Sequence, residues 1–121
     1  MTFQYPGTWE ENNLTKDYMA NVGNDTESFS LFSINTTYGG INVGNSTLSK
    51  MVRNYKLANL TTEKTLTVDG VNATLLSSPD KIRTRSIALW IKGDKFFQAE
   101  YNSQDSSTAT FEKILSTIKS T

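Results

Sequence analysis

Two tight turns in the C-terminal half of the chain constrain the fold most strongly, because each separates two apolar or alternating segments. The turns with their flanking segments are Asp69-Gly70 between residues 65–68 and 71–76, and Gly93-Asp94 between residues 82–92 and 96–101. Two-residue turns of Asp and Gly are typical of β-hairpins, because their backbone twist matches that of antiparallel strands. The sequence therefore predicts two consecutive hairpins.

Two other segments repeat apolar residues with the spacing of one helical face. They are Leu48, Met51, Val52 and Tyr55, and then Phe111, Ile114, Leu115 and Ile118. A helix with a single apolar face packs on another layer, and the hairpins supply that layer as a sheet. Residues 18–22 and 28–35 add a further strand pair across Gly23-Asn24-Asp25. We expect one α+β domain over residues 1–121, a mostly antiparallel β-sheet flanked by helices.

The chain begins with the motif Phe3-x-Tyr5-Pro6-x-x-Trp9, which is more specific than the order of helices and strands. The helix from near Leu48, the Asp69-Gly70-Val71-x-Ala73 hairpin, the Lys95-Phe96-Phe97 strand and the Phe111-to-Ile118 helix follow it. Over essentially the whole chain, these motifs resemble the PsbP-related family. That family shares an α/β/α sandwich with the Mog-type Ran-binding import factors. The resemblance implies a PsbP/Mog-like α/β/α sandwich, in which Trp9 would be a large core anchor.

The chain is rich in Asn, Thr and Ser, and in this it is most similar to PsbP-like domains of methanogen cell-surface proteins. That resemblance implies an archaeal, extracytoplasmic protein with no assigned chemistry. We therefore predict a non-enzymatic binding or accessory module at the cell surface, whose partner is another protein or an envelope component. One alternative is a cytosolic Mog-type module that binds a nucleotide-dependent switch protein. Another is a weak calcium-binding domain.

The chain contains neither Cys nor His, and this excludes several classes of chemistry together. Thiol nucleophiles, Ser-His triads, iron–sulfur clusters and histidine-ligated or cysteine-ligated zinc all need one of these residues. Twelve basic and twelve acidic residues give a net charge of zero, so no electrostatic footprint favours nucleic acid. No pair of carboxylates has a spacing that indicates a hydrolase. We expect no enzyme activity, no cofactor and no nucleic-acid partner.

No apolar run approaches the roughly 20 residues that a helix needs to cross a bilayer. We therefore expect no transmembrane segment in this chain. The first residues also lack the basic and hydrophobic regions of a signal peptide. A cell-surface location would then depend on a leader or anchor that is absent from this sequence.

Six asparagines begin an Asn-x-Ser/Thr triplet, the acceptor signal for N-glycosylation. They are Asn13, Asn24, Asn35, Asn45, Asn59 and Asn72. A glycosylated surface protein would carry such triplets. A chain with thirty Ser and Thr residues also produces them by chance, so both interpretations stay open.

Three basic residues form the strongest candidate binding site. Lys81, Arg83 and Arg85 have the same parity along a predicted strand, so their side chains would project from one face. They could bind a sulfate, a carboxylate or an acidic partner. The alternative is that they form the solvated end of a long strand.

The alternative of a weak calcium-binding domain rests on two clusters of acidic and amide side chains. They are Asn24-Asp25-x-Glu27 and Asn102-x-x-Asp105. Calcium and magnesium prefer such ligands, but neither cluster has the spacing of an EF-hand loop. Turns and helix caps explain both clusters equally well, and we predict no metal site.

Overall fold

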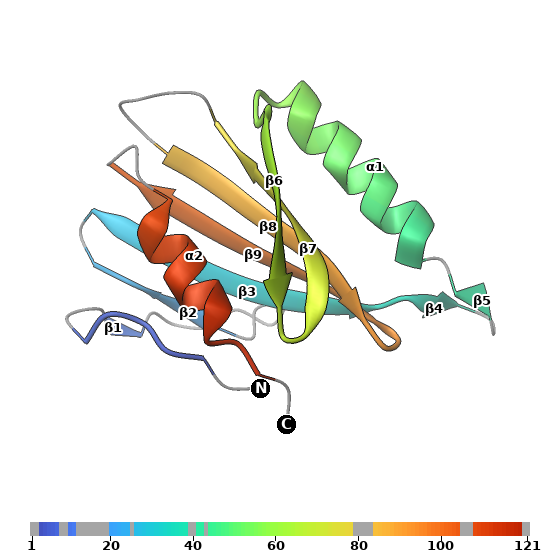
Figure 1. Ribbon diagram of the computed structural model, residues 1–121, viewed down its shortest axis with the longest axis horizontal. Coiled ribbons are helices and arrows are strands. Elements are labelled where there is room, and N and C mark those ends of the chain that lie inside the picture. The colour runs from blue at the N-terminus through green and yellow to red at the C-terminus, as the bar shows by residue number, and fades with distance from the viewer. Residues whose placement is uncertain are drawn as a thin grey trace.

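The computed structural model describes residues 3–7, 10–11, 20–24, 26–38, 41–42, 44–78, 84–104 and 108–119. Its elements are β1 (Glu10–Glu11), β2 (Ala20–Gly23), β3 (Glu27–Asn35), β4 (Thr37–Tyr38), β5 (Ile41–Asn42), α1 (Gly44–Leu57), β6 (Thr62–Val68), β7 (Val71–Ser77), β8 (Thr84–Lys92), β9 (Lys95–Ser103) and α2 (Ala109–Ser116). A seven-stranded sheet has the order β1-β2-β3-β9-β8-β7-β6, and β4 pairs with β5 separately (Figure 1). All neighbouring strands are antiparallel.

Both predicted hairpins are confirmed. β6 and β7 are closed by the pair Val68 and Val71, and Asp69 and Gly70 between them have φ values of 51° and 80°. Positive φ at both central residues is the geometry of a type I′ turn, which Asp and Gly tolerate. β8 and β9 form the second hairpin, and β2 pairs with β3 as predicted.

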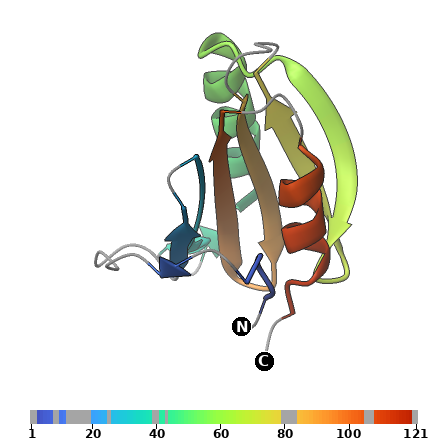
Figure 2. The same cartoon turned by 90° about the vertical axis from the view of Figure 1, so that its left-hand side faces the viewer.

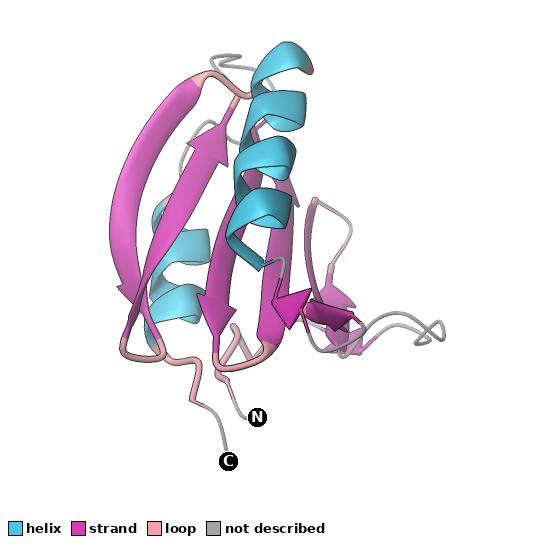
Figure 3. Cartoon of the chain, turned by 90° about the vertical axis from the view of Figure 1, so that its right-hand side faces the viewer, coloured by secondary structure: helices cyan, strands magenta, loops and turns pink. Residues whose placement is uncertain are grey.

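The two helices lie on opposite faces of the sheet (Figures 2 and 3). On one face, α1 packs on β7, β8 and β9 through the apolar stripe that the sequence predicted. On the other face, α2 buries Phe111, Ile114 and Leu115 against a cluster that includes Phe29, Trp90 and Tyr101. Each helix therefore has its own apolar cluster, and the sheet separates the two clusters.

β8 lies near the centre of the sheet and is buried on both faces. Ile87 and Leu89 belong to the cluster under α1, whereas Ala88 and Trp90 belong to the cluster under α2. Alternate residues of a strand point to opposite faces, so an uninterrupted apolar run indicates a strand covered on both sides.

The predicted PsbP/Mog-like α/β/α sandwich is wrong, because the structure is predominantly an antiparallel sheet with two short helices. α1 has 14 residues and α2 has 8. Seven strands at about 4.8 Å spacing make a sheet roughly 29 Å wide, whereas one helix is only about 10 Å across. One helix on each face therefore covers part of a face and forms no complete layer. Both predicted apolar stripes do pack on the sheet, but two short helices do not make the two helical layers of a sandwich.

The start of α1 also differs from the prediction. The sequence predicted a helix from near Leu48, but α1 begins four residues earlier, at Gly44. Trp9, the predicted core anchor, lies outside the described residues. None of the described helices is both long and apolar enough to cross a membrane.

Candidate functional site

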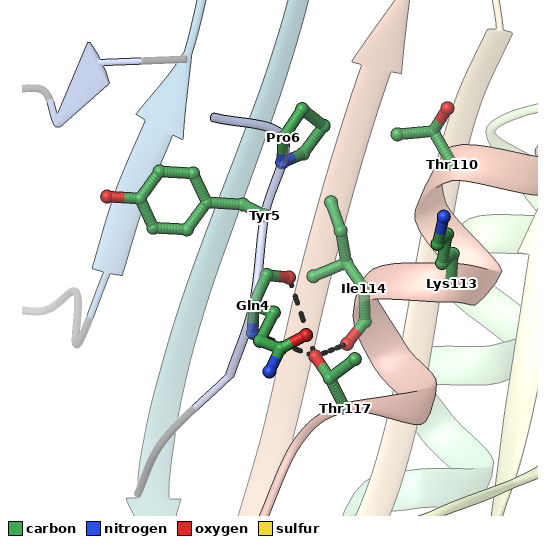
Figure 4. Close-up of a pocket in the computed structure, with 7 residues that line it drawn as sticks. All are labelled: Gln4, Tyr5, Pro6, Thr110, Lys113, Ile114 and Thr117. Atoms are coloured by element: carbon green, nitrogen blue, oxygen red, sulfur yellow. Dashed lines mark hydrogen bonds between the residues drawn. The ribbon is translucent and has the colours of Figure 1, made fainter. Parts of the chain in front are cut away.

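The N-terminal strap, defined as residues 3–6, lies on the face of the sheet that α2 covers. Phe3 and Tyr5 alternate with a polar residue, as residues of a strand do, but the strap belongs to no strand. Its two rings pack on the apolar cluster instead, and the Phe3 ring lies 5.3 Å from the Phe29 ring. Gln4, between them, is exposed and faces the end of α2 (Figure 4). The alternation therefore reflects packing on a layer and not pairing in the sheet.

Thr117 connects the strap to α2. Its Oγ1 accepts a hydrogen bond from the backbone N–H of Gln4 at 2.8 Å and donates one to the Ile114 carbonyl at 2.7 Å. A hydroxyl has one proton, so the longer 3.4 Å contact with the Gln4 carbonyl is secondary. One threonine thus ends the helix and also positions the N-terminal strap beside it.

A cleft of about 370 Å³ lies between the strap and α2. Its lining comes from both elements: Gln4, Tyr5, Pro6, Thr110, Lys113, Ile114 and Thr117 (Figure 4). Ile114 and Pro6 give the cleft an apolar wall, and Lys113 is the one charged side chain among the described residues of its lining. Lys113 forms no ion pair with another described residue. The cleft therefore combines an apolar wall with a single available positive charge.

Thr110 of the cleft lining hydrogen-bonds with Tyr101, a buried tyrosine of β9. The Tyr101 side chain is 1% exposed, and its ring stacks on Phe111 at 5.4 Å between centroids. Its hydroxyl donates a 2.5 Å hydrogen bond to Glu27 Oε1. Burial, together with this hydrogen bond to the Glu27 carboxylate, raises the pKa of Tyr101 to about 12, although hydrogen bonds with Ser103 and Thr110 oppose the rise.

The raised pKa of Tyr101 predicts a loss of stability in alkali. A folded-state pKa of about 12 against an ordinary value of 10.0 means that the folded chain holds this proton more tightly. The stabilisation is complete below pH 10 and is lost as the pH rises toward 12, by roughly 3 kcal/mol in total. Denaturant unfolding of the wild type and of Tyr101→Phe between pH 8 and about 11 checks this. An equally steep decline in both proteins would contradict it.

The predicted basic site is only partly described. Lys81 and Arg83 lie outside the described residues. Arg85 lies on the face that α1 covers, as its parity with Ile87 and Leu89 predicted. Its Nε donates to Glu100 Oε1 at 2.8 Å, and its guanidinium carbon lies 5.6 Å from the Tyr55 ring centroid. Arg85 therefore connects β9 and α1, and a ligand there would have to compete with Glu100.

The two acidic clusters show turn and strand contacts where they are described. Asn24 Oδ1 accepts hydrogen bonds from the backbone N–H groups of Thr26 and Glu27, both at 2.9 Å, which is a side-chain turn. Asp25 and Asp105 lie outside the described residues. Among the described residues, no three acidic side chains gather in a group that could hold a metal ion.

The six glycosylation triplets lie in different settings. Asn59 and Asn72 are exposed, and Asn59 follows α1 with a left-handed φ of 73°. Asn24 is exposed, although its oxygen is used by the turn. Asn35 and Asn45 are described by their backbone alone, and Asn13 lies outside the described residues.

Sequence reasoning missed the cleft. The Phe111-to-Ile118 stripe and the Phe3-to-Trp9 motif are separate patterns in the sequence, and neither marks Lys113 as part of a site. The available signal was the position of Lys113, next to the buried Ile114 but exposed at the edge of the apolar stripe. Nothing in the sequence showed that the first residues return to the last helix.

Comparison with known proteins gives a fold and no family. No protein-family model matches the chain, and no curated protein matches it. A crystal structure of a protein from Bacteroides thetaiotaomicron VPI-5482 is similar, with a TM-score of 0.68 and 12% identity. The match covers 98% of this chain and 44% of that protein. At this identity the likeness shows the fold alone. The resemblance to the PsbP-related family stays a prediction that these comparisons do not test.

Proposed function

We propose that this chain is a non-catalytic binding domain and that the cleft between the strap and α2 is its binding site. The observation that carries the proposal is the Lys113 ammonium, which forms no ion pair with another described residue and lies beside an apolar wall. Such a site suits a ligand with an apolar body and one carboxylate, held by a charge-assisted hydrogen bond. A short peptide that ends in its own carboxylate has this chemistry. Among the described residues that line the cleft, none has a carboxylate that could act as a general base.

The proposal retains the extracytoplasmic, cell-surface role that the sequence predicted. Two observations support that location: the Asn59 and Asn72 side chains are exposed, and both begin glycosylation triplets. The partner would then be a protein or an envelope component that presents a carboxylate to the cleft. Fractionation of the source cells checks the location, and recovery of the chain in the cytosol would contradict it.

A matched pair of small probes tests the cleft. The probes are 4-phenylbutyrate and 4-phenylbutyramide, which have the same apolar body and differ in charge. Titration into the ¹⁵N-labelled chain should shift the amide signals of Tyr5, Thr110 and Ile114, and the carboxylate should bind more tightly. We expect weak affinity, because the cleft is open and the probe is small.

Two lysine variants separate a specific contact from general attraction to positive charge. Lys113→Gln should weaken binding of the carboxylate about threefold to fivefold, the range of an exposed ion pair, and should leave the amide unaffected. Lys119→Gln removes the same charge from an exposed lysine outside the cleft, so it should change neither affinity. Equal weakening by both variants, or signal shifts scattered over the surface, would overturn the proposed site.

A further inference from the structure

β6 is an edge strand with an open hydrogen-bonding side. It pairs with β7 on one side, and no described segment pairs with it on the other. Figures 2 and 3 both show β6 at the outer margin of the sheet. Residues 62–65 and Thr67 are exposed. An edge strand of seven residues is a template for pairing with another chain, unless a proline, a bulge or a covering segment prevents it.

The turn geometry identifies the backbone groups that face outward. A two-residue hairpin makes Val68 and Val71 a hydrogen-bonded pair, and such pairs then alternate along the strand. Leu66, Lys64 and Thr62 therefore bond to β7. The N–H and C=O groups of Glu63, Thr65 and Thr67 point away from it. An incoming strand must place its own hydrogen-bonding residues opposite these three.

The charges on β6 are directed onto the two helices and not across the open edge. Glu63 forms a 2.9 Å ion pair with Lys56 of α1. Lys64 forms a 2.6 Å ion pair with Glu112 of α2, on the opposite face. The other two outward-bonding positions, Thr65 and Thr67, are neutral threonines. The edge is therefore polar and β-branched, and its two charges are already neutralised within the chain.

We propose that β6 pairs antiparallel with β6 of a second copy of this chain, about a two-fold axis through Thr65. In this register Thr65 meets Thr65 of the partner copy, and Glu63 meets Thr67. All three outward-bonding residues then form hydrogen-bonded pairs, with about six new backbone bonds. Lys64 lies opposite Leu66, so its aliphatic stem can cover the leucine. No two like charges are directly opposed.

The other symmetric registers are poorer, and this makes the second copy a specific occupant. An axis through Glu63 would place two carboxylates directly opposite each other, which is destabilising. An axis through Thr67 would bring Asp69, in the turn, opposite Thr65, so the hairpin would limit the length of the pairing. Only the Thr65 register uses the whole outward edge without opposing charges. The two sheets would join into one continuous sheet of fourteen strands, twice the seven of one chain.

Cysteine cross-linking tests this register directly, because the chain contains no cysteine of its own. In a hydrogen-bonded antiparallel pair the Cα atoms are about 5.5 Å apart, within the range that a disulfide spans. Mild oxidation of Thr65→Cys should therefore give a covalent dimer. Glu63→Cys and Thr67→Cys would each lie about 14 Å from their own symmetry mates, four residues along the strand, and should cross-link poorly.

Two lysine variants test the same surface without oxidation. Sedimentation equilibrium should show the wild-type mass rising from 13.5 kDa toward twice that value with concentration. Thr65→Lys puts like charges directly opposite each other and should weaken the dimer about fivefold or more. Ser49→Lys adds the same charge to an exposed position on α1 and should leave the dimer unchanged. Thermal melting confirms that both variants are folded.

The proposal is overturned by a monomer at millimolar concentration, or by cross-linking that is equally efficient at positions 63, 65 and 67. The test of the dimer does not depend on whether the cleft binds a ligand. α2 lies between the strap and β6, so the dimer would leave both clefts open (Figure 2). If the chain does not dimerise, the ligand titration of the cleft can still succeed. If the cleft binds no ligand, the dimer can still form.

Discussion

Replacement of Trp90 by alanine should lower the free energy of unfolding by about 3–5 kcal/mol, the largest effect that we expect from one side chain. Trp90 is fully buried on β8, at the centre of the cluster under α2. Its ring stacks on Phe97 with a centroid distance of 5.4 Å and an interplanar angle of 11°. Alanine would remove this contact and leave a cavity that the rigid centre of a sheet cannot close. Urea unfolding followed by circular dichroism measures the loss.

Two other substitutions show whether the loss comes from buried apolar volume. Trp90 Nε1 has no hydrogen-bond partner among the described residues, so the indole nitrogen contributes no bond that phenylalanine would lose. Trp90→Phe should therefore cost much less than Trp90→Ala. Leu57→Ala removes a side chain that is 82% exposed and should change stability by less than about 0.5 kcal/mol. A Trp90→Ala loss as small as that of Leu57→Ala would mean that this cluster is not the main core.

Phe111→Ala should cost a similar amount, about 3–5 kcal/mol, and should in addition release α2. Phe111 is fully buried and packs against two aromatic rings of the sheet. Its ring stacks on Tyr101 with 5.4 Å between ring centroids, and its centroid lies 5.9 Å from that of Phe29. α2 has eight residues, fewer than an isolated helix needs to be stable in water. The helix therefore depends on this anchor for its structure.

Hydrogen exchange distinguishes release of α2 from a uniform loss of stability. When α2 detaches, Thr117 no longer holds the backbone of Gln4, so the strap should lose protection together with the helix. The amides of β8 and β9 should stay protected at low denaturant. Phe111→Leu keeps most of the apolar volume, so the amides of the strap and of α2 should stay protected from exchange in this variant. Loss of protection in all segments at once would show that α2 and the sheet unfold as one unit.

The local elements were predictable because short-range rules determine them. The Asp69-Gly70 turn needs two positive φ values, and the four-residue stripe from Phe111 to Ile118 needs one buried face. Both requirements are visible in the sequence. The extent of helical coverage was not visible, because it depends on how many strands join one sheet. The β3–β9 pairing joins residues at least 60 positions apart, such as Asn35 and Lys95, and no local pattern encodes such a contact.

The candidate site was less predictable than the fold. The parity rule placed Arg85 on the correct face of β8, but it could not show that Glu100 and Tyr55 would contact the side chain. The cleft depends on one contact between Gln4 and Thr117, which are 113 positions apart. Individual polar residues of this kind carry no periodic signal. Sites formed between the two ends of a chain need the folded structure to be recognised.

The hydrogen bond between Gln4 and Thr117 has a mechanical consequence. A force applied between the two ends of the described chain would act directly on this bond and on the apolar contacts of the strap and α2. These contacts would break one after another, as in peeling. The long strands β3, β8 and β9 would carry load only after the strap and helix had separated from the sheet. The chain would therefore yield in two stages under tension, with a soft outer layer over a stiffer sheet.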